Sequence, residues 1–338
     1  MPIGAPRPET WIRTTAAGLY CEPGGFFIDP LRPVPRAVVT HGHGDHARPG
    51  NERVLATAAT IAIMRARHGE AAGGVLQPLA YRQSLAVGEV WVTLVPAGHV
   101  LGSAQVMLEY RGSRVVVSGD YKRRPDPTCA PFEPCRCDLF ITEATFGLPV
   151  FRHPPDRGEI DRLLHSLALF PERCHLVGVY ALGKCQRVLA LLRRAGYDAP
   201  VYLHGALCRL TELYERHGVG LGPVSPAAGA VREALRGRIV MAPPGALADP
   251  WSRRLPDPRI ALASGWMRVR QRAKARGVEL PLVISDHADW DELTATLDEI
   301  GAGEVWVTHG CEEALVYHAA KRGLRARGLA LTGFEDDA

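Results

Sequence analysis

Residues 41–46 read His-Gly-His-Gly-Asp-His and come directly after Ala37 to Val39, an apolar segment that predicts a buried strand. Imidazole and carboxylate groups are the ligands that zinc and similar divalent ions take in proteins. Ligands packed this closely on one loop cannot all reach a single ion, because the first two histidines alternate on one side while Asp45 and His46 fall on the next turn. The spacing therefore predicts two ions that share a cleft, about 3.5–4 Å apart as in two-metal hydrolases.

Three further candidate ligands each follow a predicted strand. They are His99, after residues 90–95, Asp120, after residues 114–117, and His309, after residues 305–307. Any one of them alone is typical of an ordinary loop, and a surface loop that scavenges metal is the alternative for residues 41–46. Together the loop and these residues supply seven ligands, which favours a metal centre.

The composition is that of an ordinary globular protein. The chain has 338 residues, 46% of them hydrophobic and 22% charged, which excludes a disordered chain, a coiled coil and a collagen-like repeat. It contains no run of about 18 uncharged apolar residues, so no membrane span is expected. The first residues lack the apolar core of a secretory signal. The eight cysteines are therefore expected to be reduced thiols in the cytoplasm.

The pattern of elements divides the chain. Residues up to about 145 read as short strands with one helix, at 58–68, which is typical of stacked sheets. From residue 156 to 216 helices and strands alternate, as in a parallel α/β unit. Residues 218–259 are rich in Pro and Gly. Residues 282–321 again alternate between strand and helix.

The charge is distributed unevenly between these regions. Residues 148–281 carry 21 Lys and Arg against 11 Asp and Glu, a balance of +10, whereas the remainder has a balance of −6. A basic region within an otherwise acidic chain indicates a polyanionic partner. Chance combined with an arginine-rich composition, 36 Arg among 40 basic residues, is an equally weighted alternative before any motif is considered.

The ligand pattern resembles the metallo-β-lactamase fold, an α/β fold with a four-layer αββα core and two metals at one sheet edge. The resemblance implies that His41, His43, His99 and Asp120 hold one ion, and that Asp45, His46, His309 and Asp120 hold the other, with Asp120 bridging. It also implies that Asp29, which follows the strand ending at Ile28, is a buried acidic partner of a ligand. A turn aspartate before Pro30 is a nearly equal alternative for Asp29.

Two further motifs resemble those of the β-CASP nucleases. Thr142 to Gly147 is similar to the acidic motif that opens the β-CASP insertion, and Ser285 to Asp289 is similar to the motif that follows it. The resemblance implies a core part over 1–147, an inserted β-CASP α/β domain over 148–281 and a second core part over 282–338. The sequence of residues 142–154 most resembles that of the bacterial ligase-associated DNA exonucleases.

The resemblance implies a two-metal phosphodiesterase that degrades DNA in repair. Its ions would be zinc, with manganese as the alternative, and its partners DNA, an ATP-dependent DNA ligase and a helicase. His287 would protonate the leaving oxygen, and Glu143 would orient His287. The alternatives are a β-CASP ribonuclease, a small-molecule hydrolase and a non-catalytic subunit. His309 conflicts with DNA as substrate, since histidine in the final motif often accompanies RNA substrates in the family.

Several basic residues are candidates for phosphate binding. They are Lys122, Arg123, Lys184, Arg187 and Arg268, with Arg272 and Arg276 on the same predicted helix face as Arg268. A solvated surface is the alternative for each. Cys129, Cys135 and Cys137 lack the paired spacing of structural zinc sites, so buried thiols are expected there.

Overall fold

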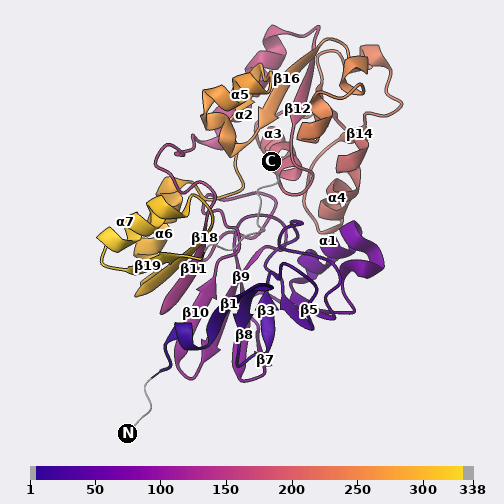
Figure 1. Ribbon diagram of the computed structural model, residues 1–338. Coiled ribbons are helices and arrows are strands. Elements are labelled where there is room, and N and C mark those ends of the chain that lie inside the picture. The colour runs from indigo at the N-terminus through magenta and orange to yellow at the C-terminus, as the bar shows by residue number, and fades with distance from the viewer. Residues whose placement is uncertain (1–4, 330–338) are drawn as a thin grey trace. The chain divides into compact units, whose positions relative to one another are not determined.

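The computed structural model describes residues 5–329 and divides into two compact units (Figure 1). The first unit comprises Met1–Pro149 together with His287–Ala338, and the second comprises Val150–Asp286. The predicted insertion, residues 148–281, overlaps the second unit almost completely. Within the described residues, no helix is long and apolar enough to cross a membrane.

The first unit contains two sheets. One has six strands in the order β1-β2-β3-β4-β5-β6, formed by Ile12–Thr15, Gly18–Cys21, Phe26–Ile28, Arg36–Val38, Arg53–Ala56 and Val75–Pro78. The other has seven strands in the order β19-β18-β11-β10-β9-β8-β7. In chain order from β7 to β11 these are Ser84–Val87, Val90–Pro96, Ala104–Tyr110, Ser113–Val117 and Leu139–Ala144, and β18 and β19 are Glu304–Gly310 and Arg325–Gly328.

Three hydrophobic cores hold the layers of this unit together, one between the two sheets and one between each sheet and its helices. Apolar side chains such as Phe26, Leu94 and Trp306 fill the space between the two sheets. Helix α1 (Ala58–His68) packs on the outer face of the first sheet through Ile61 and Met64. Helices α6 (Trp290–Ile300) and α7 (Glu312–Lys321) cover the outer face of the second sheet (Figure 1). The four layers are therefore αββα, as expected.

The second unit is a parallel α/β fold. Its six strands, all parallel, follow the order β14-β13-β15-β12-β16-β17. In chain order from β12 they are Cys174–Gly178, Val201–Leu203, Val224–Pro226, Ile239–Ala242, Pro258–Ala263 and Leu280–Leu282. The helices are α2 (Asp156–Leu169), α3 (Lys184–Arg194), α4 (Gly205–Arg216) and α5 (Arg270–Ala275).

Two features differ from the sequence pattern. Strand β15 lies in the Pro- and Gly-rich stretch and is nevertheless fully buried between β12 and β13, because its four apolar residues suit a central strand. The strand expected at the start of residues 282–321 lies two residues earlier, as β17, Leu280–Leu282. Strand β11 runs to Ala144 and includes Glu143.

Candidate metal centre

The ends of four strands bring the predicted ligands together. The 41–46 loop follows β4, while His99, Asp120 and His309 lie after β8, after β10 and near the end of β18. Two groups result, within each of which one ligand atom per residue lies within 4.8 Å of every other. The first is His41, His43, His99 and Asp120, and the second is Asp45, His46 and His309.

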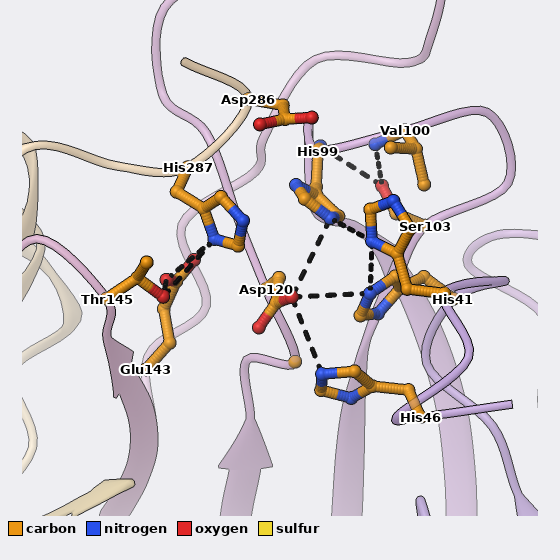
Figure 2. Close-up of polar contacts among 12 residues, drawn as sticks. His41, His46, His99, Val100, Ser103, Asp120, Glu143, Thr145, Asp286 and His287 are labelled. Atoms are coloured by element: carbon orange, nitrogen blue, oxygen red, sulfur yellow. Dashed lines mark hydrogen bonds and ion pairs between the residues drawn. The ribbon is translucent and has the colours of Figure 1, made fainter. Parts of the chain in front are cut away.

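Asp120 lies at the centre of the cluster (Figure 2). Its Oδ2 atom is 3.3 Å from His41 Nε2, 3.4 Å from His46 Nε2 and 3.7 Å from His99 Nε2. Its Oδ1 atom is buried and has no hydrogen-bond partner within residues 5–329. A carboxylate that faces histidines of both groups is placed as a bridging ligand would be.

Polar residues behind the histidines fix their ring orientation. Thr40 Oγ1 donates to Asp29 Oδ2 at 2.6 Å, and it therefore accepts from His41 Nδ1 at 3.0 Å. Asp29 Oδ2 also lies 2.7 Å from His46 Nδ1. With both Nδ1 atoms acting as donors, the Nε2 lone pairs face the centre of the cluster, as in metal-binding histidines. Asp29 takes the position predicted for it, whereas the role of Thr40 was missed.

Burial and neighbouring charges shift the pKa values of the clustered residues. Burial opposes a charge on His46, but three neighbouring carboxylates, Asp120 foremost, outweigh burial and raise its pKa well above the usual range. Burial likewise opposes the charge on Asp120, yet the surrounding histidines hold its pKa well below the usual range. Burial lowers the pKa of His41 strongly and that of His309 to about 4, so both present neutral imidazoles. The seven residues supply imidazole nitrogens and carboxylate oxygens, and this set of donors fits a pair of divalent ions.

Unusual backbone conformations accompany two of these residues. Asp29 and His309 have φ values of 44° and 60°, in the left-handed region that side chains other than glycine rarely adopt. In the pairing of β11 with β18, the register passes from Thr308 to Gly310 across one residue of the partner strand, so His309 is the extra residue of a β-bulge. The bulge turns the His309 side chain into the site.

His287 lies beside the ligands and is held by an acidic partner. Glu143 Oε2 is 2.9 Å from His287 Nδ1 and accepts from Thr145 Oγ1 at 2.6 Å (Figure 2). Glu143 Oε1 accepts from the backbone N–H of Tyr121 at 2.7 Å. Full burial raises the pKa of Glu143, while the imidazole opposes this rise. The predicted pairing of Glu143 with His287 is therefore present, and Thr145 adds a contact that sequence reasoning did not assign.

Lys122 is buried and does not face solvent. Its Nζ donates to the carbonyl of His287 at 3.0 Å and to Glu292 Oε2 at 3.1 Å. The same carboxylate closes the capping box of α6, where Glu292 accepts from Asp289 N at 3.0 Å. This burial conflicts with the predicted phosphate-binding role of Lys122, which instead ties the Asp120 loop to the His287 loop. Arg123 is partly exposed and pairs with Glu299.

Lys184 and Arg187 are buried within the second unit. Lys184 Nζ lies 2.5 Å from Asp286 Oδ1, and Arg187 Nη2 lies 2.5 Å from Asp156 Oδ2. Because both charges are neutralised in the interior, their predicted phosphate-binding role conflicts with the structure. Arg268, by contrast, is exposed.

The cysteines form no additional metal site among the described residues. All eight are free thiols, and none belongs to a group of potential metal ligands in residues 5–329. Burial raises the pKa of Cys137 to about 12, as expected for an inert thiol.

Comparison with known proteins agrees with this geometry. Residues 27–175 match the family described as "Metallo-beta-lactamase superfamily". An Opitutus terrae protein named "Probable DNA ligase" is 31% identical over 94% of this chain, and the chain spans only about a third of that protein, 31% of its length. A protein of Thermus thermophilus named a ribonuclease is 28% identical over 91% of this chain and 88% of its own length.

A solved structure shares the fold. A crystal structure of an Enterococcus faecalis protein superimposes with a TM-score of 0.59 over 88% of this chain and 80% of that one, at 15% sequence identity. At this identity the likeness concerns the fold alone, and it extends through both units.

Proposed function

Because the chain belongs to the metallo-β-lactamase superfamily, we propose that it is a two-metal phosphodiesterase that degrades DNA. The observation that carries the proposal is the position of His287, held by Glu143 at 2.9 Å and grouped with Asp120. A metal centre alone suits many hydrolases, whereas an acid placed next to it suits a reaction with a poor leaving group, such as a sugar hydroxyl.

The ligand residues would hold the two ions as the sequence predicts. When bound, such ions make a water molecule nucleophilic at neutral pH and offset negative charge on phosphoryl oxygens. We take zinc as the resident metal and manganese as the alternative, since imidazole nitrogens supply most of the donors.

The other residues of the site orient groups and move a proton. Asp29 and Thr40 keep His46 and His41 in the tautomers that present Nε2 to the ions. Glu143 holds Nδ1 of His287, so that proton transfer to the leaving oxygen falls to Nε2 of that ring. Lys122 fixes the backbone of His287 and thereby the distance between this acid and the bridging carboxylate.

DNA is favoured as substrate by the Opitutus relative, because that protein is named a DNA ligase and this chain matches about a third of it. A nuclease that cooperates with a DNA ligase would trim ends before they are sealed, and we propose this repair role. Association with a helicase stays a prediction. The second candidate is a ribonuclease, favoured by the Thermus relative, which is named a ribonuclease and is matched over 88% of its length.

One experiment tests the proposal and separates its rivals. The purified chain is analysed for metal and then incubated with matched DNA and RNA strands, each labelled at one end. We expect about two equivalents of divalent metal, faster cleavage of DNA and products that shorten progressively from an end. Faster cleavage of RNA would make the ribonuclease the better assignment, and no cleavage of either strand would overturn both.

A further inference from the structure

The second unit carries a run of five basic residues within nine positions of the chain. Arg268, Arg270, Arg272, Lys274 and Arg276, which we call the basic segment, are all exposed. None of the five forms an ion pair within residues 5–329, and no acidic residue interrupts the segment. Some other exposed arginines of this unit are paired, among them Arg157 with Asp161, Arg162 with Glu159 and Arg236 with Glu233.

The basic segment rests on an apolar anchor. Met267 and Ala273 are each 4% exposed and pack in a cluster with Leu262 and Val283. The segment spans a short 3₁₀ helix, Gly265–Arg268, and α5. Its cations therefore project from an ordered scaffold rather than from a loose loop.

One cation of the segment is already oriented by an aromatic ring. The Arg272 guanidinium lies 4.1 Å from the centre of the Trp266 ring, and Phe151 meets the same ring edge-on at 5.1 Å. Arg272 is exposed, so the side of its guanidinium that faces away from Trp266 is open to solvent, and unpaired bases stack on guanidinium planes.

We propose that Trp266 and the basic segment form a docking surface for single-stranded nucleic acid. The cations contact successive phosphates, and a base stacks on Arg272. Unbalanced positive charge beside an arginine plane matches a strand of alternating phosphates and bases better than it matches an acidic protein. The substrate class rests on the proposed function, and the new element is the surface.

A charge-matched pair of variants tests the phosphate contacts. The full-length chain is titrated with a labelled single strand in EDTA, which prevents hydrolysis, over a series of salt concentrations. The variant R268Q/R272Q/R276Q and the control R157Q/R162Q/R236Q remove the same charge from the same unit. Neutralising three phosphate contacts flattens the slope of log affinity against log salt by about 2, whereas the control flattens it by much less. Equal effects of the two triple variants, or no effect of either, would overturn the surface.

The variant Arg272→Lys tests the stacking. Lysine keeps the charge and loses the plane, so the salt slope stays unchanged while affinity for the strand falls about fivefold or more. The same strand without bases should bind wild type and variant alike. An unchanged affinity for the intact strand would remove the stacking role.

The outcomes of these measurements distinguish a failure of the docking surface from a failure of the proposed function. Binding in EDTA does not require hydrolysis, so a chain that binds through this surface but cleaves nothing would overturn the nuclease and keep the surface. Cleavage of DNA with no change in binding for the first triple variant would do the reverse. Thermal unfolding of each variant confirms that it is folded.

Discussion

Two buried clusters of charge in this chain differ in how they are balanced. In the second unit, the cations of Lys184 and Arg187 each meet a carboxylate at 2.5 Å. Around Asp120, the grouped side chains are imidazoles and carboxylates only, and their donor atoms converge within 4.8 Å. Asp120, Lys184 and Arg187 are all buried. Buried carboxylates that are neutralised by Lys or Arg stabilise the fold. Buried carboxylates that converge with histidines, without a Lys or Arg, are placed to bind a metal cation.

The largest effect should follow from removing the centre of the unbalanced cluster. In Asp120→Ala both metal groups lose the carboxylate that faces them, so we expect loss of both ions and hydrolysis at background level. Elemental analysis and turnover of a nitrophenyl phosphodiester measure this. Asp126→Ala, which removes a buried carboxylate that accepts hydrogen bonds from Thr128, is the control and should keep its metal. Retention of one ion with full activity would refute the bridging role.

His287→Ala should slow turnover of nucleic acid by about 10²–10⁴, the usual worth of a general acid. Both ions should remain, because His287 is assigned as an acid and not as a ligand. A nitrophenyl diester, whose leaving group needs little protonation, should lose much less activity. Equal losses on the two substrates, or loss of metal, would contradict this assignment.

Lys184→Met breaks one of the balanced pairs. It leaves Asp286 buried without its cation, and such a change costs about 3–5 kcal/mol of unfolding free energy. Denaturation in urea measures the loss. The salt dependence of nucleic-acid binding should stay as in wild type, since Lys184 is internal; a flatter slope in a folded variant would restore the phosphate contact predicted from sequence.

Lys122→Met is expected to act on rate through His287. Without the hydrogen bond to the His287 carbonyl, turnover should fall about tenfold, comparable with the worth of one charge-assisted hydrogen bond. Metal content should be unchanged, and Lys122→Arg should recover part of the rate. If kcat is unaffected while stability falls, Lys122 is structural only.

The smallest effect is on the pH dependence of stability, and it arises from His175, a buried histidine of the second unit. Burial lowers its pKa to about 4 from an ordinary value of 6.5, and Ser166 Oγ lies 2.9 Å from its Nε2. The unfolded chain therefore binds a proton more readily, so this contribution to stability is complete above pH 6.5 and is lost as the pH falls towards 4. The variant His175→Gln should show a weaker loss of stability over that range, and parallel curves for both proteins would contradict the shift.

The sequence predicted which histidines and aspartates converge, because these residues follow strands in recognisable local motifs. The predicted fold is confirmed for the same reason. The basic residues were harder to interpret, because the partner that buries Lys184 is 102 positions away and no local pattern reveals it. Strand β15 was missed because its neighbours in the sheet, rather than its flanking prolines and glycines, decide its structure. Thr40 shares a single hydroxyl between two side chains, which is a property of the folded geometry alone.

The placement of β18 has a consequence for synthesis of the chain on the ribosome. This strand lies between β11 and β19 and carries His309, yet it is made only after the whole second unit. At about 5–20 residues per second, some 10–40 seconds separate the appearance of Asp120 from that of His309. Until then β11 lacks one neighbour and the second ligand group lacks a member. A nascent chain that has not yet reached β18 therefore lacks one member of the ligand cluster.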